Sequence, residues 1–158
     1  MLTFTFLDKT QKEQWLPKLF ELLYANMHTI APGDLTYEQE KQQWTENVSP
    51  ALEKEPRKVI LCLDDDDLVG YVQYYTNGSL LMIEEIQIAK AYQRTTLFYS
   101  LCKYLAKALP EEIEIVEAYA EKRNLHSQKI MRKLGMVQID EDGPFAHFRG
   151  SARKFKVS

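Results

Sequence analysis

The sequence predicts a single α/β domain in which a mixed, mostly antiparallel sheet is flanked by helices. The length of 158 residues is within the usual range for one domain, here 1–158. The content of 45% hydrophobic and 27% charged residues is ordinary for a globular protein. Segments with the alternation of strands are interleaved with segments of helical spacing, which favours a sheet covered on both faces.

The expected order of elements is β-α-α-β-β-β-α-β-α-β-β. The strands are expected at residues 3–7, 58–63, 68–75, 80–88, 112–120, 136–139 and about 148–157. The helices are expected at about 10–28, 36–52, 97–108 and 124–135.

The first third of the chain predicts a strand and then two helices. Phe4 and Phe6 lie on one face of the strand. Thr10–Glu13 and Thr36–Gln39 both fit the capping box, in which the first and last side chains bond each other's backbone amides. Pro17 should either kink the first helix or mark its first turn.

The middle of the chain predicts a three-stranded meander followed by an amphipathic helix. The four aspartates 64–67 fit a solvated hairpin turn better than a metal or acidic recognition site, because adjacent like charges repel one another. Asn77-Gly78 is the strongest short hairpin signal in the chain. Pro110 ends the helix.

The last third predicts a strand, a short helix and a final pair of strands. Asn124 is expected to cap the helix, and Gly135 to end it, because glycine readily takes the left-handed conformation of a helix stop. A turn at Gly143-Pro144 joins the last two strands.

Charge and composition exclude several classes of protein. The net charge of −3 argues against nucleic acid as a partner. No apolar stretch reaches transmembrane length, and residues 1–8 lack the basic flank of a signal peptide, so no membrane association is expected. Cys62 and Cys102 lie in apolar segments and are expected to be reduced, buried thiols of a cytoplasmic protein. No Cys/His spacing resembles a zinc site, so no metal is expected. The protein is expected to be a monomer or a homodimer, and the sequence does not distinguish the two.

Three segments resemble the GCN5-related N-acetyltransferase (GNAT) superfamily, and the order of elements matches over essentially the whole chain. Leu68–Tyr71 resembles the family's third strand, with a glycine after two apolar residues. Ile83–Gln93 resembles its fourth strand, with an acidic pair, apolar residues and then a tyrosine and a glutamine. Asn124–Met136 resembles its asparagine-headed helix, which ends in leucine, glycine and an aromatic residue, here replaced by Met136. The resemblance implies an N-acetyltransferase that moves an acetyl group from acetyl-CoA to a primary amine of a small molecule or peptide.

The expected cofactor site also has a physical basis. A diphosphate needs unpaired N–H groups at a helix N-terminus, and the loop 93–98 opens the main helix directly after a strand. The fourth strand should splay from the fifth there, so that the pantetheine arm can bond its free edge. The residues expected to bind acetyl-CoA are Ile86, Ile88, Gln93, Arg94, Thr95, Thr96, Leu97, Asn124 and Ser127.

Amine transfer needs a base, because an ammonium group has no lone pair. Glu84 matches the glutamate that removes this proton in some polyamine acetyltransferases, and it is the expected catalytic residue. Glu85 should face the other way on a regular strand. The alternative is that both are solvated glutamates on a half-exposed strand.

Three positions depart from the family pattern. Thr96 and Phe98 replace the small residues of the phosphate loop, and Phe98 could either join the core or block the groove. Met131 stands where many members have a tyrosine that protonates the leaving thiolate, although Tyr92 could stand in. A catalytically impaired GNAT-fold module for CoA binding or regulation is therefore the alternative function, and an unrelated α/β binding domain is a third.

Aromatic side chains beside Glu84 and Glu85 would suit a small cationic amine as the acceptor. A polyamine, an aminoglycoside and a peptide N-terminus all stay open. The aromatic residues expected between the second helix and the third strand are Tyr37, Trp44, Tyr74 and Tyr75. The alternative for Tyr37 and Trp44 is that they simply form the buried face of their helix.

Overall fold

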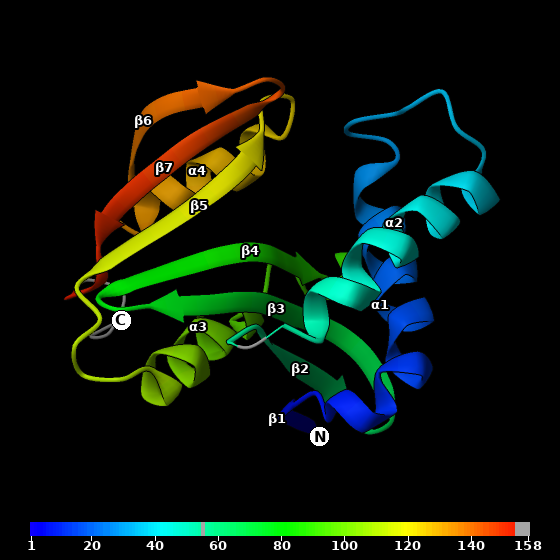
Figure 1. Ribbon diagram of the computed structural model, residues 1–158, viewed down its shortest axis with the longest axis horizontal. Coiled ribbons are helices and arrows are strands. Elements are labelled where there is room, and N and C mark those ends of the chain that lie inside the picture. The colour runs from blue at the N-terminus through cyan, green and yellow to red at the C-terminus, as the bar shows by residue number, and fades with distance from the viewer. Residues whose placement is uncertain (55, 154–158) are drawn as a thin grey trace.

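The structure, a computed structural model, describes residues 1–54 and 56–153 and has the predicted order of elements (Figure 1). The strands are β1 (Leu2–Phe6), β2 (Lys58–Asp64), β3 (Asp67–Asn77), β4 (Leu80–Ile88), β5 (Ile115–Glu121), β6 (Val137–Asp142) and β7 (Phe145–Ser151). The α-helices are α1 (Lys12–Met27), α2 (Tyr37–Leu52), α3 (Leu97–Ala108) and α4 (Leu125–Lys133), and the 3-10 turns are η1 (Lys9–Gln11) and η2 (Lys90–Tyr92). The strands form one sheet in the order β1-β2-β3-β4-β5-β7-β6. Every neighbouring pair is antiparallel except β4 and β5, so the predicted mixed sheet is confirmed.

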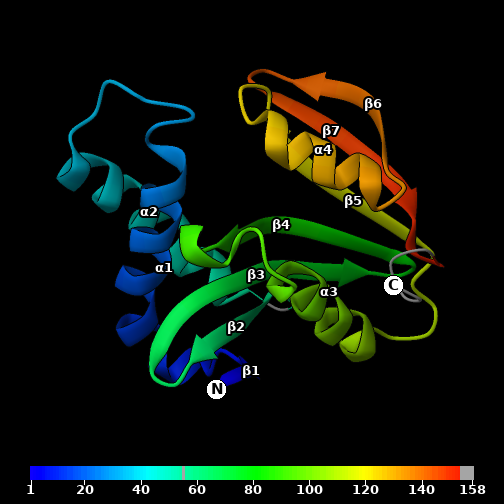
Figure 2. The same ribbon diagram turned by 180° about the vertical axis from the view of Figure 1, so that it is seen from behind.

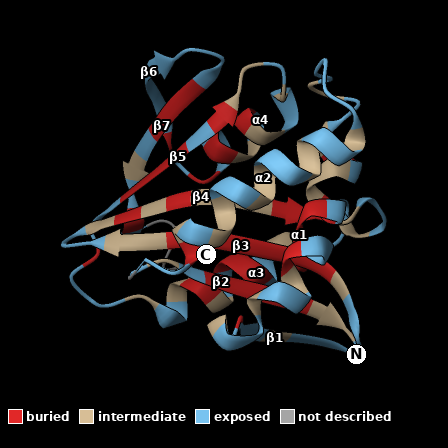
Figure 3. Ribbon diagram, turned by 45° about the vertical axis from the view of Figure 1, so that its right-hand side comes forward, coloured by how far each residue is buried: buried red, intermediate tan, exposed pale blue. Residues whose placement is uncertain are grey.

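The helices cover the sheet unevenly. α1 and α2 lie on one face of β2–β4, whereas α3 lies on the other face and α4 backs β5 and β7 from that same side (Figure 1, Figure 2). Val59 and Leu61 of β2 pack with α1 and α2, while Ile60 and Cys62 pack in the larger core with α3. β6 is exposed throughout (Figure 3). The expected cover on both faces therefore holds for β2–β4, whereas among the described residues α4 alone covers β5–β7.

The two predicted capping boxes have different outcomes. The box at Thr36 forms, because its hydroxyl accepts from the Gln39 amide at 3.2 Å and the Gln39 side chain accepts from the Thr36 amide at 2.9 Å. The box at Thr10 is wrong. The Asp8 carboxylate accepts from both the Thr10 amide and its hydroxyl, so Thr10 lies in η1, before α1 begins. Pro17 lies inside α1, beyond its first turn.

The predicted turns are confirmed, and the boundaries of the last strands needed correction. Asp65 joins β2 to β3 in the left-handed region at φ 53°, and Gly78 has φ 59° in the next hairpin. β6 runs to Asp142 and β7 begins at Phe145, both beyond the ranges read from the sequence. The strand signal is weak there because aspartates form the end of β6. The expected extension over residues 154–157 lies outside the described residues.

The β4–β5 junction is short. The parallel pairing runs from Leu80 opposite Ile115 to Ile83 opposite Ala118. Beyond these pairs both strands continue without each other, and they diverge in Figure 1. The predicted splay is thus confirmed, and the second half of β4 has a free edge.

Both cysteines are buried free thiols, as expected. No helix in the described part of the chain is long and apolar enough to span a membrane.

Candidate active site

A cleft of about 690 Å³ opens where β4 and β5 separate. α1 and α2 line one wall, the ends of β5 and the start of α4 line the other, and β4 lies between them. Of the predicted site residues, Glu84, Ile86, Ile88, Gln93, Asn124 and Ser127 line this cleft. Within the described residues, no cluster of His, Cys, Asp and Glu could hold a metal ion.

A β-bulge brings two carboxylates into the cleft together. Gln73 of β3 pairs with Glu85 and Tyr74 pairs with Ile83, so Glu84 is the extra residue on β4. The Gln73 side-chain amide reaches Glu84 Oε1 at 3.3 Å, and both glutamates line the cleft. The expectation that Glu85 faces away was therefore wrong, because the bulge interrupts the regular alternation of side chains.

Glu84 is held in an ion pair. Its Oε1 accepts from Arg57 Nε at 2.9 Å and its Oε2 accepts from Arg57 Nη2 at 3.1 Å. Arg57 also lies over the ring of Tyr75, 5.0 Å from the ring centroid, and the hydrogen bond to Glu84 raises the pKa of its guanidinium. The two carboxylate oxygens of Glu84 thus form a two-point pairing with the guanidinium of Arg57.

Among the described residues, Glu85 has no cationic partner. It accepts a hydrogen bond of 2.6 Å from Gln87 Nε2. Burial raises its pKa to about 7, against the lowering effect of the Gln87 hydrogen bond and with a smaller contribution from the charge on Glu84. Glu85 therefore gains and loses a proton near neutral pH.

The raised pKa of Glu85 predicts that the free energy of unfolding decreases as the pH rises. The native state holds the Glu85 proton more tightly than the unfolded state, whose pKa is the ordinary one. Stability is therefore lost as pH rises from the ordinary value through about 7, and the loss is complete above that pH. Because the side chain is half-buried, Glu85→Gln should raise the free energy of unfolding at pH 8 by about 1–3 kcal/mol.

Urea unfolding of wild type and Glu85→Gln at pH 5 and pH 8 checks this decrease. The gain should be clearly smaller at pH 5. Equal gains at both pH values would show that the substitution acts through packing instead.

The free edge of β4 offers a few backbone groups to a ligand. The Ala89 amide bonds Val69 on β3 at 2.8 Å, so the backbone groups of Ile86 and Ile88 point the opposite way, toward the opening left by β5. The Ile88 carbonyl already accepts from Asn26 Nδ2 at 2.8 Å and from Gln93 Nε2 at 3.0 Å. The N–H and C=O of Ile86 and the N–H of Ile88 remain for a pantetheine-like chain.

The loop before α3 is held together by its own side chains. Gln93 turns back onto β4, and Thr95 Oγ1 donates to the Tyr92 carbonyl at 2.6 Å and accepts from the Leu97 amide at 3.2 Å. The Leu97 side chain is 1% exposed and lies in the core. Gln93 and Leu97 therefore anchor this loop, rather than offering free side chains to a cofactor.

Some amides of this loop have no acceptor among the described residues. In the described part of the chain, the N–H groups of Thr96 and Phe98 have no hydrogen-bond partner. They lie at the N-terminus of α3, where backbone donors and the helix dipole favour an anion. Phe98 itself is half-buried: it packs against the core, as one expectation had it, and it also lines the cleft.

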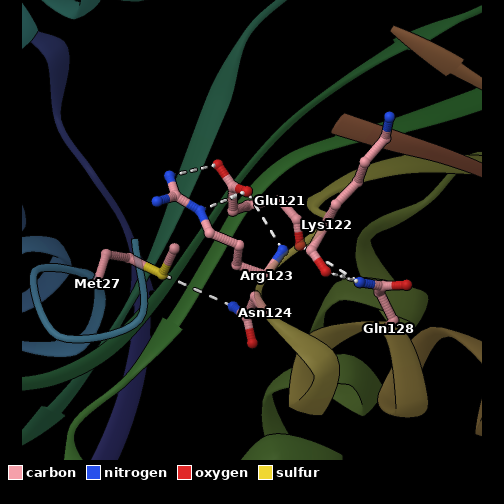
Figure 4. Close-up of polar contacts among 6 residues, drawn as sticks. All are labelled: Met27, Glu121, Lys122, Arg123, Asn124 and Gln128. Carbon is pink, nitrogen blue, oxygen red and sulfur yellow. Dashed lines mark hydrogen bonds and ion pairs between the residues drawn. The ribbon is translucent and has the colours of Figure 1, made fainter. Parts of the chain in front are cut away.

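The start of α4 approaches α1 across the cleft (Figure 4). Asn124 Oδ1 accepts from the Ser127 amide at 3.1 Å, as the predicted cap, and Asn124 Nδ2 donates to Met27 Sδ at 3.6 Å. Gln128 Nε2 donates to the Lys122 carbonyl at 2.8 Å and so holds the turn from β5. Met131 is buried, as expected of a core residue.

The aromatic wall differs from the predicted one. Trp44 lines the cleft, whereas Tyr74 is in the core and Tyr75 lies under Arg57. Phe20 and Tyr24 of α1 complete the wall, and sequence reasoning missed them although they lie one turn apart on the same helix. The pocket therefore lies between α1, α2 and β4, not between α2 and β3.

Four glutamates and two histidines, His28 and His126, line the cleft. The lining glutamates are Glu40, Glu84, Glu85 and Glu121. Among the described residues that line the cleft there is no lysine or arginine. This charge pattern suits a cationic molecule.

Comparison with known proteins assigns the fold to a family. Residues 15–136 match the model of the Acetyltransferase (GNAT) family. The chain belongs to this family. No curated protein matches the sequence.

Solved acetyltransferase structures share the fold over nearly the whole chain. PaiA N-acetyltransferase from Thermoplasma acidophilum, in complex with coenzyme A, has a TM-score of 0.76 and 14% identity over 96% of this chain and 99% of that chain. An acetyltransferase from Thermus thermophilus has a TM-score of 0.71 and 16% identity over 96% and 97%. The ribosomal-protein-S18-alanine N-acetyltransferase from Escherichia coli has a TM-score of 0.65 and 12% identity over 96% and 94%.

Proposed function

We propose that this GNAT protein is an N-acetyltransferase that moves the acetyl group of acetyl-CoA to a primary amine of a small cationic molecule or a peptide. The observation that supports this best is the position of Glu85. Its carboxylate lies in the cleft on the same stretch of β4 whose edge is free at Ile86 and Ile88. A base and a site for an extended cofactor arm are thus adjacent.

The residues of the chain fit acetyl-CoA, which would supply an acyl thioester. Ile86 and Ile88 would bond its pantetheine arm through their backbone groups, as an added strand does. The amides of Thr96 and Phe98 would bind its diphosphate, beside the exposed Arg94. Gln93, Thr95 and Leu97 would keep this loop in place, and Asn124 and Ser127 would form the opposite wall.

The proposed base is Glu85, with a pKa of about 7, close to the value at which a general base works best near neutral pH. It would accept the proton of the acceptor ammonium, which then has a lone pair for attack. The assignment of this role to Glu84, suggested by the sequence, is the alternative. The paired Arg57 is the observation that favours Glu85.

The proposed acceptor class rests on charge and on aromatic faces. The rings of Phe20, Trp44 and Tyr24 form a wall near the lining glutamates. Ammonium groups are attracted both by carboxylates and by aromatic faces. A diamine or a basic peptide would therefore bind better than a neutral amine of the same length.

Two measurements test the function. Acetyl-CoA should raise the melting temperature, with a gain of about 2.7 kcal/mol in stability at 100 times Kd. Cationic diamines should then release free thiol from acetyl-CoA faster than neutral monoamines do, while acetyl-CoA without amine is the control. A melting temperature that does not move at millimolar acetyl-CoA would refute the proposal.

The second candidate is a catalytically impaired GNAT module that binds CoA. Three residues favour it. Thr96 and Phe98 are larger than the small residues expected in the phosphate loop, and Met131 cannot donate the proton that a tyrosine at its position would supply. Binding of acetyl-CoA without thiol release for any amine would support this candidate.

A further inference from the structure

A chain of side-chain amides runs from the cofactor loop to the proposed base. Gln93 Nε2 donates to Asn26 Oδ1 at 3.3 Å, and Asn26 Nδ2 donates to Gln87 Oε1 at 2.9 Å. Gln87 Nε2 in turn donates to Glu85. Asn26 and Gln87 are only 9% and 7% exposed, so they are buried polar groups whose hydrogen bonds are made inside the protein.

One backbone group sets the direction of the chain. The Ile88 carbonyl can only accept, so the nitrogen of Asn26, not its oxygen, must face it. The second hydrogen of that nitrogen points to Gln87 Oε1, and this directs the nitrogen of Gln87 at Glu85. The same carbonyl also accepts from Gln93. The direction of each bond therefore follows from an acceptor that cannot be reversed.

We propose that Asn26 is a positioning residue of the active site, which holds Gln87 as a hydrogen-bond donor to Glu85 and anchors Gln93 of the cofactor loop. This inference rests on the proposed role of Glu85 as the base. A donor from Gln87 stabilises the carboxylate of Glu85. Without Asn26 the Gln87 amide is free to turn over and offer its oxygen, which would instead stabilise the protonated acid.

The other groups that the structure describes near Glu85 do not supply this donor. Glu84 is beside it on β4, and its negative charge, paired with Arg57, can only oppose ionisation of Glu85. Burial raises the pKa of Tyr71 of β3, and the nearby charge of Glu85 raises it further, but the Tyr71 hydroxyl has no hydrogen-bond partner in the described part of the chain. On the α1 side, Asn26 is the polar residue that reaches this network.

The test compares Asn26→Leu, Gln87→Met and the double variant by carbon NMR titration of the glutamate carboxyl groups, with Glu85→Gln to assign the Glu85 signal. Each single variant should raise the Glu85 midpoint by about one pH unit, which is a tenfold change in the ratio of ionised to protonated Glu85. The double variant should show no further rise, because the two residues act in series. Gln42→Leu, which removes an exposed amide that bonds Glu46 on α2, is the matched control and should leave the midpoint unchanged.

Kinetics then separate the two roles of Asn26. The acidic limb of the kcat/KM profile should move up with the NMR midpoint in both single variants. The KM for acetyl-CoA should rise in Asn26→Leu but not in Gln87→Met, because Gln93 loses an anchor in the first variant alone.

Several results would overturn the inference. If the Glu85 titration midpoint does not move in Gln87→Met, the inference is wrong, even if Asn26→Leu fails to fold. If the shifts of the two single variants add up in the double variant, the inference is also wrong. The titration needs no activity, so it tests the amide chain even if the protein acetylates nothing. A shifted midpoint with an unshifted rate profile would instead refute Glu85 as the base, and with it the catalytic role of Asn26.

Discussion

Glu85→Gln should lower kcat by about 10²–10⁴-fold, the usual worth of a general base, while leaving the affinity for acetyl-CoA nearly unchanged. Glutamine keeps the size of the side chain but cannot take the ammonium proton. The pH profile of the residual activity should lose its acidic limb near pH 7. Steady-state rates at saturating acceptor, from pH 5.5 to 9, measure both effects.

Glu84→Gln is the matched control on the neighbouring residue. It removes the partner of Arg57 and should reduce stability, but it should keep the acidic limb of the profile. If Glu84→Gln instead abolishes the acidic limb of the pH profile and Glu85→Gln retains it, the base is Glu84 and not Glu85.

Leu97→Ala should lower the free energy of unfolding by about 2–5 kcal/mol, because it opens a cavity in the core beneath the first turn of α3. It should also weaken acetyl-CoA binding, although Leu97 offers its side chain to no ligand, because that turn presents the free amides of Thr96 and Phe98. Urea unfolding and calorimetry with acetyl-CoA, both well below the melting temperature, give the two quantities.

Tyr99→Ala controls for a change of side chain in the same turn. Tyr99 is 55% exposed and touches Phe98 edge-on, so its loss should cost less than about 1 kcal/mol. An equal loss of stability in both variants would mean that the core contact of Leu97 does not hold the loop.

The fold was largely predictable from sequence because its signals are local. The hairpin at Asn77-Gly78, the capping box at Thr36 and the stop at Gly135 each depend on residues next to one another in the chain. The capping box at Thr10 failed for a local reason as well, since Asp8 competes for the same amide. The last strands were misplaced because β6 has no buried face from which a pattern could arise.

The candidate site was predicted less well because its contacts join distant parts of the chain. The free edge at Ile86 and the cap at Asn124 follow from local pattern and were expected. The pairing of Arg57 with Glu84 and the hydrogen bonds of Asn26 connect residues far apart in sequence. Nothing in the sequence marks Glu84 as a bulge residue, so the alternation rule assigned Glu85 to the opposite face.

The four β4–β5 pairs divide the sheet into two plates that share one short edge. One plate is β1–β4 with α1–α3, and the other is β5–β7 with α4, with the hydrogen bond between Met27 and Asn124 crossing between them. Proteins open locally in contiguous cooperative units, and an opening along this edge would break few backbone bonds. A molecule bound in the cleft contacts both plates. It raises the free energy needed to separate them, because its binding energy is lost when they open. Substrate would therefore slow amide hydrogen exchange in β5 and β7 as well as in the strands it contacts.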